Sequence, residues 1–201
     1  MKRSWIVINL VALIVLAALA CAKAPQDDIG AAQAEMDKAN QAHADTWAPT
    51  EYAAAKEAMD AATAEIAAQD GKWMKNYDKG KELLAKAKEN AAKATEVAAA
   101  NREQTKKDAE AGLAAADTAI QAAEAALKTA PQTKDSKADL ALMKNDLATL
   151  RATLDQARQS FSSEDYKRAL DSAGSVKDKA ASITDQVAAA KKKRSAPVKK
   201  K

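Results

Sequence analysis

The chain has 201 residues, of which 30% are charged and 3% aromatic, with five glycines, four prolines, one cysteine and one histidine. One cysteine excludes an internal disulfide, and the small aromatic content excludes a thick core of large side chains. Residues 191–201 carry seven positive charges and no negative one, whereas residues 22–190 hold 23 Lys and Arg against 28 Asp and Glu. The body is therefore mildly acidic, which argues against nucleic acid as a partner.

The first element is an apolar run that begins after the positive residues Lys2 and Arg3. It extends from Trp5 to Leu19, and its 15 residues are fewer than the roughly 20 that a membrane-spanning helix needs. Small residues then lead to Cys21. This order of positive, apolar and small segments predicts a secretory signal peptide over residues 1–20.

The small residues before Cys21 resemble the lipobox of bacterial lipoproteins. The resemblance implies cleavage before Cys21, a diacylglycerol with palmitate-like chains on its thiol, and a lipidated linker over 21–26. Several acyl chains would anchor the mature chain stably to a membrane. An ordinary signal peptide or a short membrane anchor remains the alternative.

Six apolar stripes with alternating spacings of three and four residues follow, and this periodicity is typical of packed helices. They extend over residues 29–43, 52–66, 77–98, 113–127, 140–161 and 166–187. No run alternates with period two, so no strand is expected. The pattern predicts an all-α fold, an elongated antiparallel helical bundle with coiled-coil-like packing through small alanines.

Turn signals separate most of these stripes. They are Pro49 after Trp47-Ala48, Asp70-Gly71, the loop 130–136 and the polar run 162–165. The polar stretch 101–108, NREQTKKD, contains no such signal. One long helix is therefore expected from about Trp73 to Thr129, with a kink or loop near Asn101 as the alternative.

A repeat is visible in these elements. Tyr77 and Tyr166 lie 89 residues apart, each near the start of a helix that follows a turn. This predicts two tandem three-helix units, 27–105 and 106–190, that share the long central helix, followed by a flexible basic tail over 191–201. We expect the two tyrosines to fill the ends of helical hairpins, and Trp47 and Trp73 to pack at the ends of the second helix.

The passage WAPTEYAAAKEAMDAATAEIAAQDGKWMKNYDKGKELLAKAKENAAKA, residues 47–94, resembles the bacterial lipoprotein family called domain of unknown function 4398. That family has an aromatic-Ala-Pro-x-Glu start, a helix with spaced alanines and a Tyr-x-x-Ala helix. Gly80 stands here where the family has Ala. The resemblance covers about residues 27–105 and implies an envelope lipoprotein with a helical periplasmic domain, but no activity.

Residues typical of catalysis or metal binding are scarce. His43 is the only histidine, and the chain contains no Gly-rich phosphate loop, no G-x-S-x-G and no H-E-x-x-H motif. A lone histidine with scattered carboxylates is a weak metal site, so a structural role for His43 is favoured. Met36, Met59 and Met143 lie on the stripes and are expected to fill the core. No enzyme activity, cofactor or metal is expected.

The basic tail is the one signal without a packing explanation. Lys199, Lys200 and Lys201 are candidates for contact with the cell wall or an anionic envelope polymer. A terminal lysine resembles the end of the murein lipoprotein, whose C-terminal lysine amine is joined to peptidoglycan. The alternative is a tail that only aids solubility.

The leading hypothesis is a non-enzymatic lipoprotein of the outer membrane that faces the periplasm. It would act as a helical spacer or tether between that membrane and peptidoglycan. Ala22 after Cys21 resembles outer-membrane sorting, for which Asp at this position would mean retention at the inner membrane. The alternative is a periplasmic adaptor, or a subunit of an envelope complex or homo-oligomer, that presents an Ala-rich helical surface to a protein partner.

Overall fold

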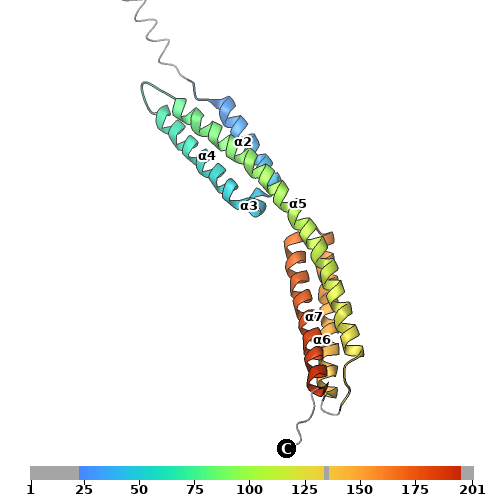
Figure 1. Cartoon of the computed structure of the whole chain (residues 1–201). Coiled ribbons are helices and arrows are strands. Elements are labelled where there is room, and N and C mark those ends of the chain that lie inside the picture. Colours follow the sequence, from blue (N-terminus) through green and yellow to red (C-terminus); the bar gives the residue numbers. More distant parts are fainter. Residues whose placement is uncertain (1–22, 134–135, 196–201) are drawn as a thin grey trace, which may run out of the picture. The chain divides into compact units, whose positions relative to one another are not determined.

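The structure is a computed structural model that describes residues 23–133 and 136–195, and every regular element in those ranges is a helix (Figure 1). The all-α prediction is therefore confirmed. The helices are α2 (Gln26–Gln41), α3 (Ala44–Trp47), α4 (Pro49–Asp70), α5 (Asp78–Lys128), α6 (Lys137–Ser162) and α7 (Tyr166–Ser195).

The described residues divide into two compact units, with the division between Asn101 and Arg102. Unit 1 contains α2, α3, α4 and residues 78–101 of α5, and unit 2 contains residues 102–128 of α5 with α6 and α7. The 51 residues of α5 form one unbroken helix, so no loop interrupts the polar stretch 101–108. No side chain from residue 99 to residue 108 is buried. Ala, Lys, Glu and Gln are common in and around this stretch, and their high helix propensity keeps it helical.

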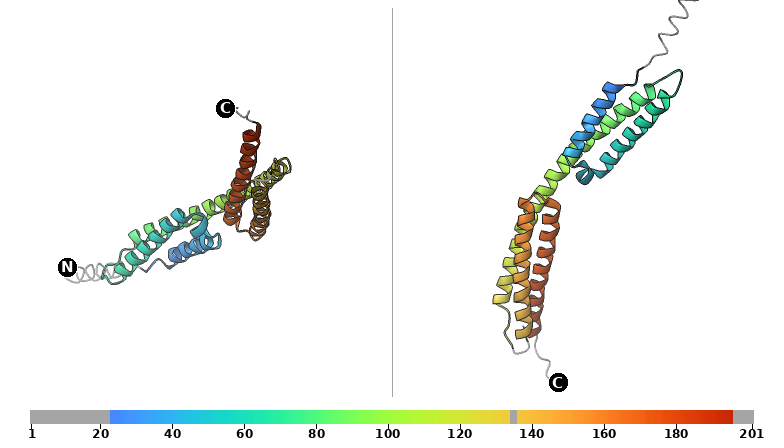
Figure 2. Two further views of the ribbon diagram at one scale, coloured as in Figure 1. Left: turned by 90° about the horizontal axis from the view of Figure 1, so that it is seen from below. Right: turned by 180° about the vertical axis from the view of Figure 1, so that it is seen from behind.

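The three main helices of unit 1 lie side by side, as the two views of Figure 2 also show. Helices α4 and α5 are antiparallel, because residues later in α5 contact residues earlier in the segment that contains α3 and α4. Gly80 lies against Ile66, the Asn90 amide donates to the Ala54 carbonyl at 3.2 Å, and the Asn101 amide donates to the Trp47 carbonyl at 2.8 Å. The Tyr52 hydroxyl donates to Asn40, which joins α4 to α2.

Alanine fills most of the core of unit 1. Buried alanines from all its helices, with Met36, Ile66, Tyr77 and Leu84, make up two clusters of apolar side chains. Because an alanine methyl is small, the helix axes can approach closely, and the stripe positions predicted for α5 from Tyr77 to Ala98 are all buried. Met36 is buried in the core, as expected, whereas Met59 is partly buried and packs against it.

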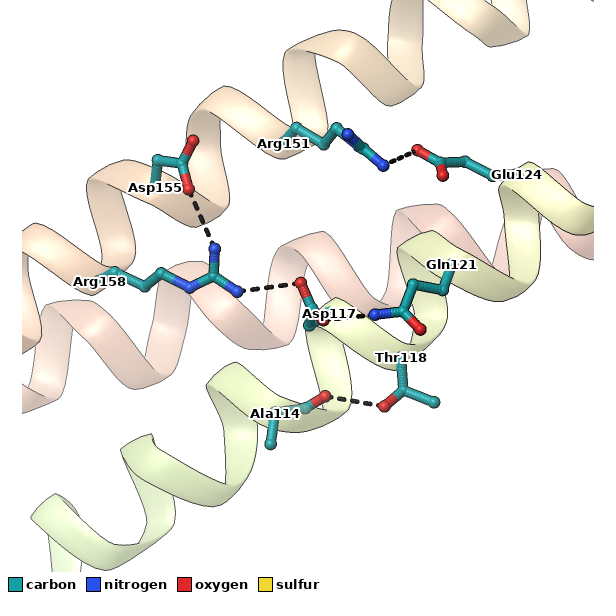
Figure 3. A network of polar contacts seen from close by, with 8 residues as sticks. All are labelled: Ala114, Asp117, Thr118, Gln121, Glu124, Arg151, Asp155 and Arg158. Carbon is teal, nitrogen blue, oxygen red and sulfur yellow. Dashed lines mark hydrogen bonds and ion pairs between the residues drawn. The ribbon is translucent and has the colours of Figure 1, made fainter.

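Unit 2 has larger core side chains. Its single cluster contains leucines, isoleucines and valines from α5, α6 and α7, with Met143 packed against it. The α5–α6 pair is antiparallel, since Asp117 faces Arg158 and Glu124 faces Arg151 (Figure 3). These ion pairs lie at the rim of the core, where half-exposed arginines bridge the two helices.

The predicted tail boundary is wrong for residues 191–195. They are helical, because α7 continues to Ser195, so Lys191–Arg194 are not part of a flexible segment. Lysine and arginine favour helix and interact well with the negative end of the helix dipole.

Candidate functional site

The residues that the sequence marked for chemistry lie largely outside the described ranges. Cys21 and the candidate wall-contact residues Lys199, Lys200 and Lys201 are all outside them. No helix among the described residues is both long enough and apolar enough to cross a bilayer. Lys23 is the described residue nearest in sequence to the candidate lipidation site.

His43 does not continue the stripe of α2. That helix ends at Gln41, and His43 follows in the left-handed backbone region with φ of 52°. Its backbone N–H donates to the Asn40 carbonyl at 2.9 Å, and its side chain is exposed. A residue in this conformation is typical of a helix C-terminus, so His43 reverses the chain between α2 and α3.

The described residues contain no cluster of three or more His, Cys, Asp or Glu side chains suited to a metal ion. Across the same ranges every buried side-chain nitrogen and oxygen has a hydrogen-bond partner. A pocket in unit 2 is lined by Leu127, Lys144 and Leu147, and its two most prominent charges, Glu124 and Arg151, are paired with each other. Lys128, Gln132 and Lys144 are the other polar residues of its lining, and they form no metal-binding cluster.

Trp73 corrects a prediction. Trp47 packs against the core of unit 1, as expected, but Trp73 is 89% exposed and the adjacent Met74 is 77% exposed. Both lie in the loop between α4 and α5, called here the apolar loop (residues 71–77). Trp73 does not pack the end of α4 because Tyr77, on the same loop, occupies the core position beside Ile66 and Leu84.

The apolar loop is held by hydrogen bonds at both ends. The Tyr77 hydroxyl donates to the Asp70 carboxylate, and the Asp78 backbone N–H donates to the Asn76 side-chain oxygen at 2.8 Å. The Lys75 ammonium lies 3.7 Å from the Asp70 carboxylate. The hydrogen bond with Asp70, the burial of the ring and the nearby negative charge raise the pKa of the Tyr77 hydroxyl above 10.0.

The start of the described chain lies at this loop. Lys23 lines one pocket together with Met74, Lys75, Tyr77 and Lys81, and Figure 1 shows the beginning of α2 beside the α4–α5 connection. Lys23 is the first residue that the structure describes, so the apolar loop lies beside the start of the described chain. The sequence signal for this site was an apolar Trp-Met pair that lies between two stripes rather than on one.

The chain is therefore an all-α protein of two helical units. In unit 1 an exposed apolar loop, residues 71–77, lies beside the start of the described chain. Comparison with protein-family models, curated proteins and solved structures found no match for the chain. The likeness to the family called domain of unknown function 4398 stays a prediction.

Proposed function

We propose that the chain is a non-enzymatic cell-envelope lipoprotein, anchored to the outer membrane by acyl chains on Cys21, that acts as a helical spacer or tether toward peptidoglycan. The observation that carries the proposal is the burial of the apolar stripes. The stripe residues from Tyr77 to Ala98 and from Ala116 to Leu127 are buried within their own units, and Leu113, the first residue of the second stripe, is partly buried against the core of unit 2. A protein whose main work is to present a helical groove would leave such a stripe exposed for its partner.

The arrangement of charges also supports a spacer. Ion pairs lie on the solvated faces of the helices, such as Lys79 with Glu82 and Lys107 with Glu103. These pairs are individually weak, but they keep the outer faces polar along α5. The 51 continuous residues of α5 give a chain of this kind a stiff element.

The first test is fractionation of cells that produce the full chain. Peptidoglycan is boiled in detergent, digested with lysozyme and blotted for the protein, with and without deletion of Lys199–Lys201. Protein that resists the detergent, and is lost with the deletion, supports a covalent tether. A control variant, Lys191–Lys193→Gln, removes a similar charge from α7 and should leave a covalent attachment intact.

The second test concerns the anchor. Cys21→Ser should abolish the added acyl mass and move the protein out of the membrane fraction. A protein found wholly in the detergent-soluble membrane fraction, unchanged by deletion of Lys199–Lys201, would contradict the covalent tether. The adaptor would then be the better hypothesis, with the exposed Leu142 of α6 as the first surface to examine.

A further inference from the structure

The apolar loop is the part of unit 1 in which large apolar side chains stay exposed. Trp73 and Met74 are the large apolar side chains that stay mostly exposed in the described part of this unit, and they are consecutive. Burial of such side chains is otherwise the main stabilising force of the fold. The two side chains are adjacent and exposed, and hydrogen bonds hold the loop that carries them at both ends. Together they form a small apolar surface that is not part of the core.

Lysines surround this apolar pair. Residues 70–81 contain four lysines and two aspartates, and Lys23 adds a further positive charge in the same pocket. One aspartate, Asp70, is already engaged by Tyr77 and Lys75, the other, Asp78, lines the pocket with Lys23, and Lys79 pairs with Glu82. Tryptophan with lysine is the combination that proteins place at the headgroup level of membranes, where the ring is half in the apolar layer and the ammonium meets phosphate.

The position of the loop in the chain selects a bilayer over other partners. Lys23 lines the pocket that contains Met74, and Cys21 precedes it by two residues. If acyl chains on Cys21 enter a membrane, as the proposed function requires, the apolar loop meets the surface of that membrane. No other exposed apolar pair is adjacent to the start of the described chain.

We propose that the apolar loop is a second membrane contact, in which Trp73 and Met74 insert into the headgroup region of an anionic phospholipid bilayer beside the acyl chains of Cys21. The inference rests on the proposed lipid anchor for its placement. The contact would hold unit 1 by two points, the acyl chains and the loop, rather than by a flexible linker alone. Lys23, Lys72 and Lys81 would lie against lipid phosphates.

The test uses the full chain, purified and reconstituted in phosphatidylethanolamine–phosphatidylglycerol vesicles whose acyl chains carry bromine, a contact quencher of tryptophan. Trp5→Phe is present throughout. Trp47→Phe then leaves Trp73 as the reporter, and Trp73→Phe leaves Trp47 as the matched control at the opposite end of α4. The two positions are separated by the 22 residues of that helix, roughly 33 Å.

The expected result is a blue shift and a loss of most Trp73 emission in brominated vesicles, with Trp47 emission almost unchanged. Equal emission from Trp73 and Trp47 in protein that is bound to vesicles would overturn the proposal. Lys72→Gln combined with Lys81→Gln should reduce the quenching of Trp73 in anionic vesicles and have little effect in neutral ones.

Failure of the anchor is detected separately. Intact mass of the purified protein reports whether Cys21 is acylated, independently of fluorescence. If it is not acylated, the lipoprotein hypothesis fails, and the same protein is mixed with brominated vesicles at increasing lipid concentration. Quenching of Trp73 in that titration still supports the loop contact, and its absence at saturating lipid rejects it.

Discussion

The hydroxyl of Tyr77 donates a hydrogen bond to the carboxylate of Asp70, so the residue just before α5 is tied to the last residue of α4. The Tyr77 ring is buried among Ala32, Ile66 and Leu84. The Tyr77 ring therefore fills the end of the hairpin, as predicted from the sequence. Its hydroxyl also joins the two ends of the loop.

This contact predicts a pH dependence of stability. The pKa of Tyr77 is above 10.0 in the folded chain and near that value when unfolded, so the folded state holds the proton more tightly. The stabilisation is complete below about pH 10 and is lost as the pH rises through the higher folded pKa. Tyr77→Phe should remove this dependence, measured as the difference in thermal unfolding between variant and wild type from pH 8 to pH 11.

Asp70→Asn is the matched control for Tyr77→Phe. It retains an acceptor for the hydroxyl but removes the negative charge that raises the pKa of Tyr77. The alkaline loss of stability should therefore be smaller than in the wild type and should be complete at a pH nearer 10. Identical pH profiles for wild type, Tyr77→Phe and Asp70→Asn would contradict the role of this pair.

Gly80 allows the close approach of α4 and α5. A Cβ placed on Gly80 would lie 2.7 Å from Cγ1 of Ile66, which is buried. Overpacking of this kind costs about 1–3 kcal/mol. The gain in helix propensity from Gly to Ala is about 1 kcal/mol, so Gly80→Ala should lower the free energy of unfolding by about 1 kcal/mol net.

Gly174 in α7 provides the comparison, because a Cβ there would meet nothing within 4 Å. Gly174→Ala should raise the free energy of unfolding by about 1 kcal/mol through helix propensity alone. Chemical denaturation monitored by circular dichroism measures both variants. A gain for Gly80→Ala equal to that for Gly174→Ala would show that Ile66 moves aside freely.

The core of unit 2 depends on large side chains, and two leucines of α6 test this. Leu154 is 2% exposed, whereas Leu142 is 62% exposed. Leu154→Ala should lower the free energy of unfolding by about 2–5 kcal/mol, since it removes buried contacts and leaves a cavity. Leu142→Ala should change it by less than about 0.5 kcal/mol. Similar losses in calorimetry would mean that Leu142 is covered in solution.

Arg102 links the start of unit 2 to its α6–α7 turn. Its guanidinium lies 5.4 Å from the centroid of the Tyr166 ring and pairs with Glu164. A cation–π contact at an exposed site contributes about 0.5–1 kcal/mol. An exposed ion pair contributes a further ~0.2–1 kcal/mol, so Arg102→Ala should lower the free energy of unfolding by about 1 kcal/mol.

Arg151→Ala is the control for Arg102. Arg151 pairs with Glu124, and its side chain is 59% exposed. Its loss should cost less than about 0.5 kcal/mol. Thermal unfolding in low and high salt separates the contributions, because salt screens the ion pairs more than the contact with Tyr166. Equal losses for both arginines would exclude the cation–π contribution.

The bounds of the helices were predicted well because their signals are local. Pro49 begins α4, Asp70 ends it, and Tyr166 begins α7, as the turn signals indicated. The start of α5 was predicted about five residues too early, since residues 72–77 contain no proline or glycine that would mark the boundary. The candidate site was predicted less well, because the exposure of Trp73 depends on which aromatic residue takes the core position, and Tyr77 takes it.

The sequence by itself determined the all-α class, the stripes and the alanine-rich packing, because a period of 3.6 residues and helix propensity act within a few residues of each position. Only the tertiary structure decided the register in which Gly80 meets Ile66 and the position of Lys23 beside Met74. It also decided which aromatic side chains lie in water. These depend on contacts between segments distant in the chain, where alanine stripes of similar composition offer little local information about their partners.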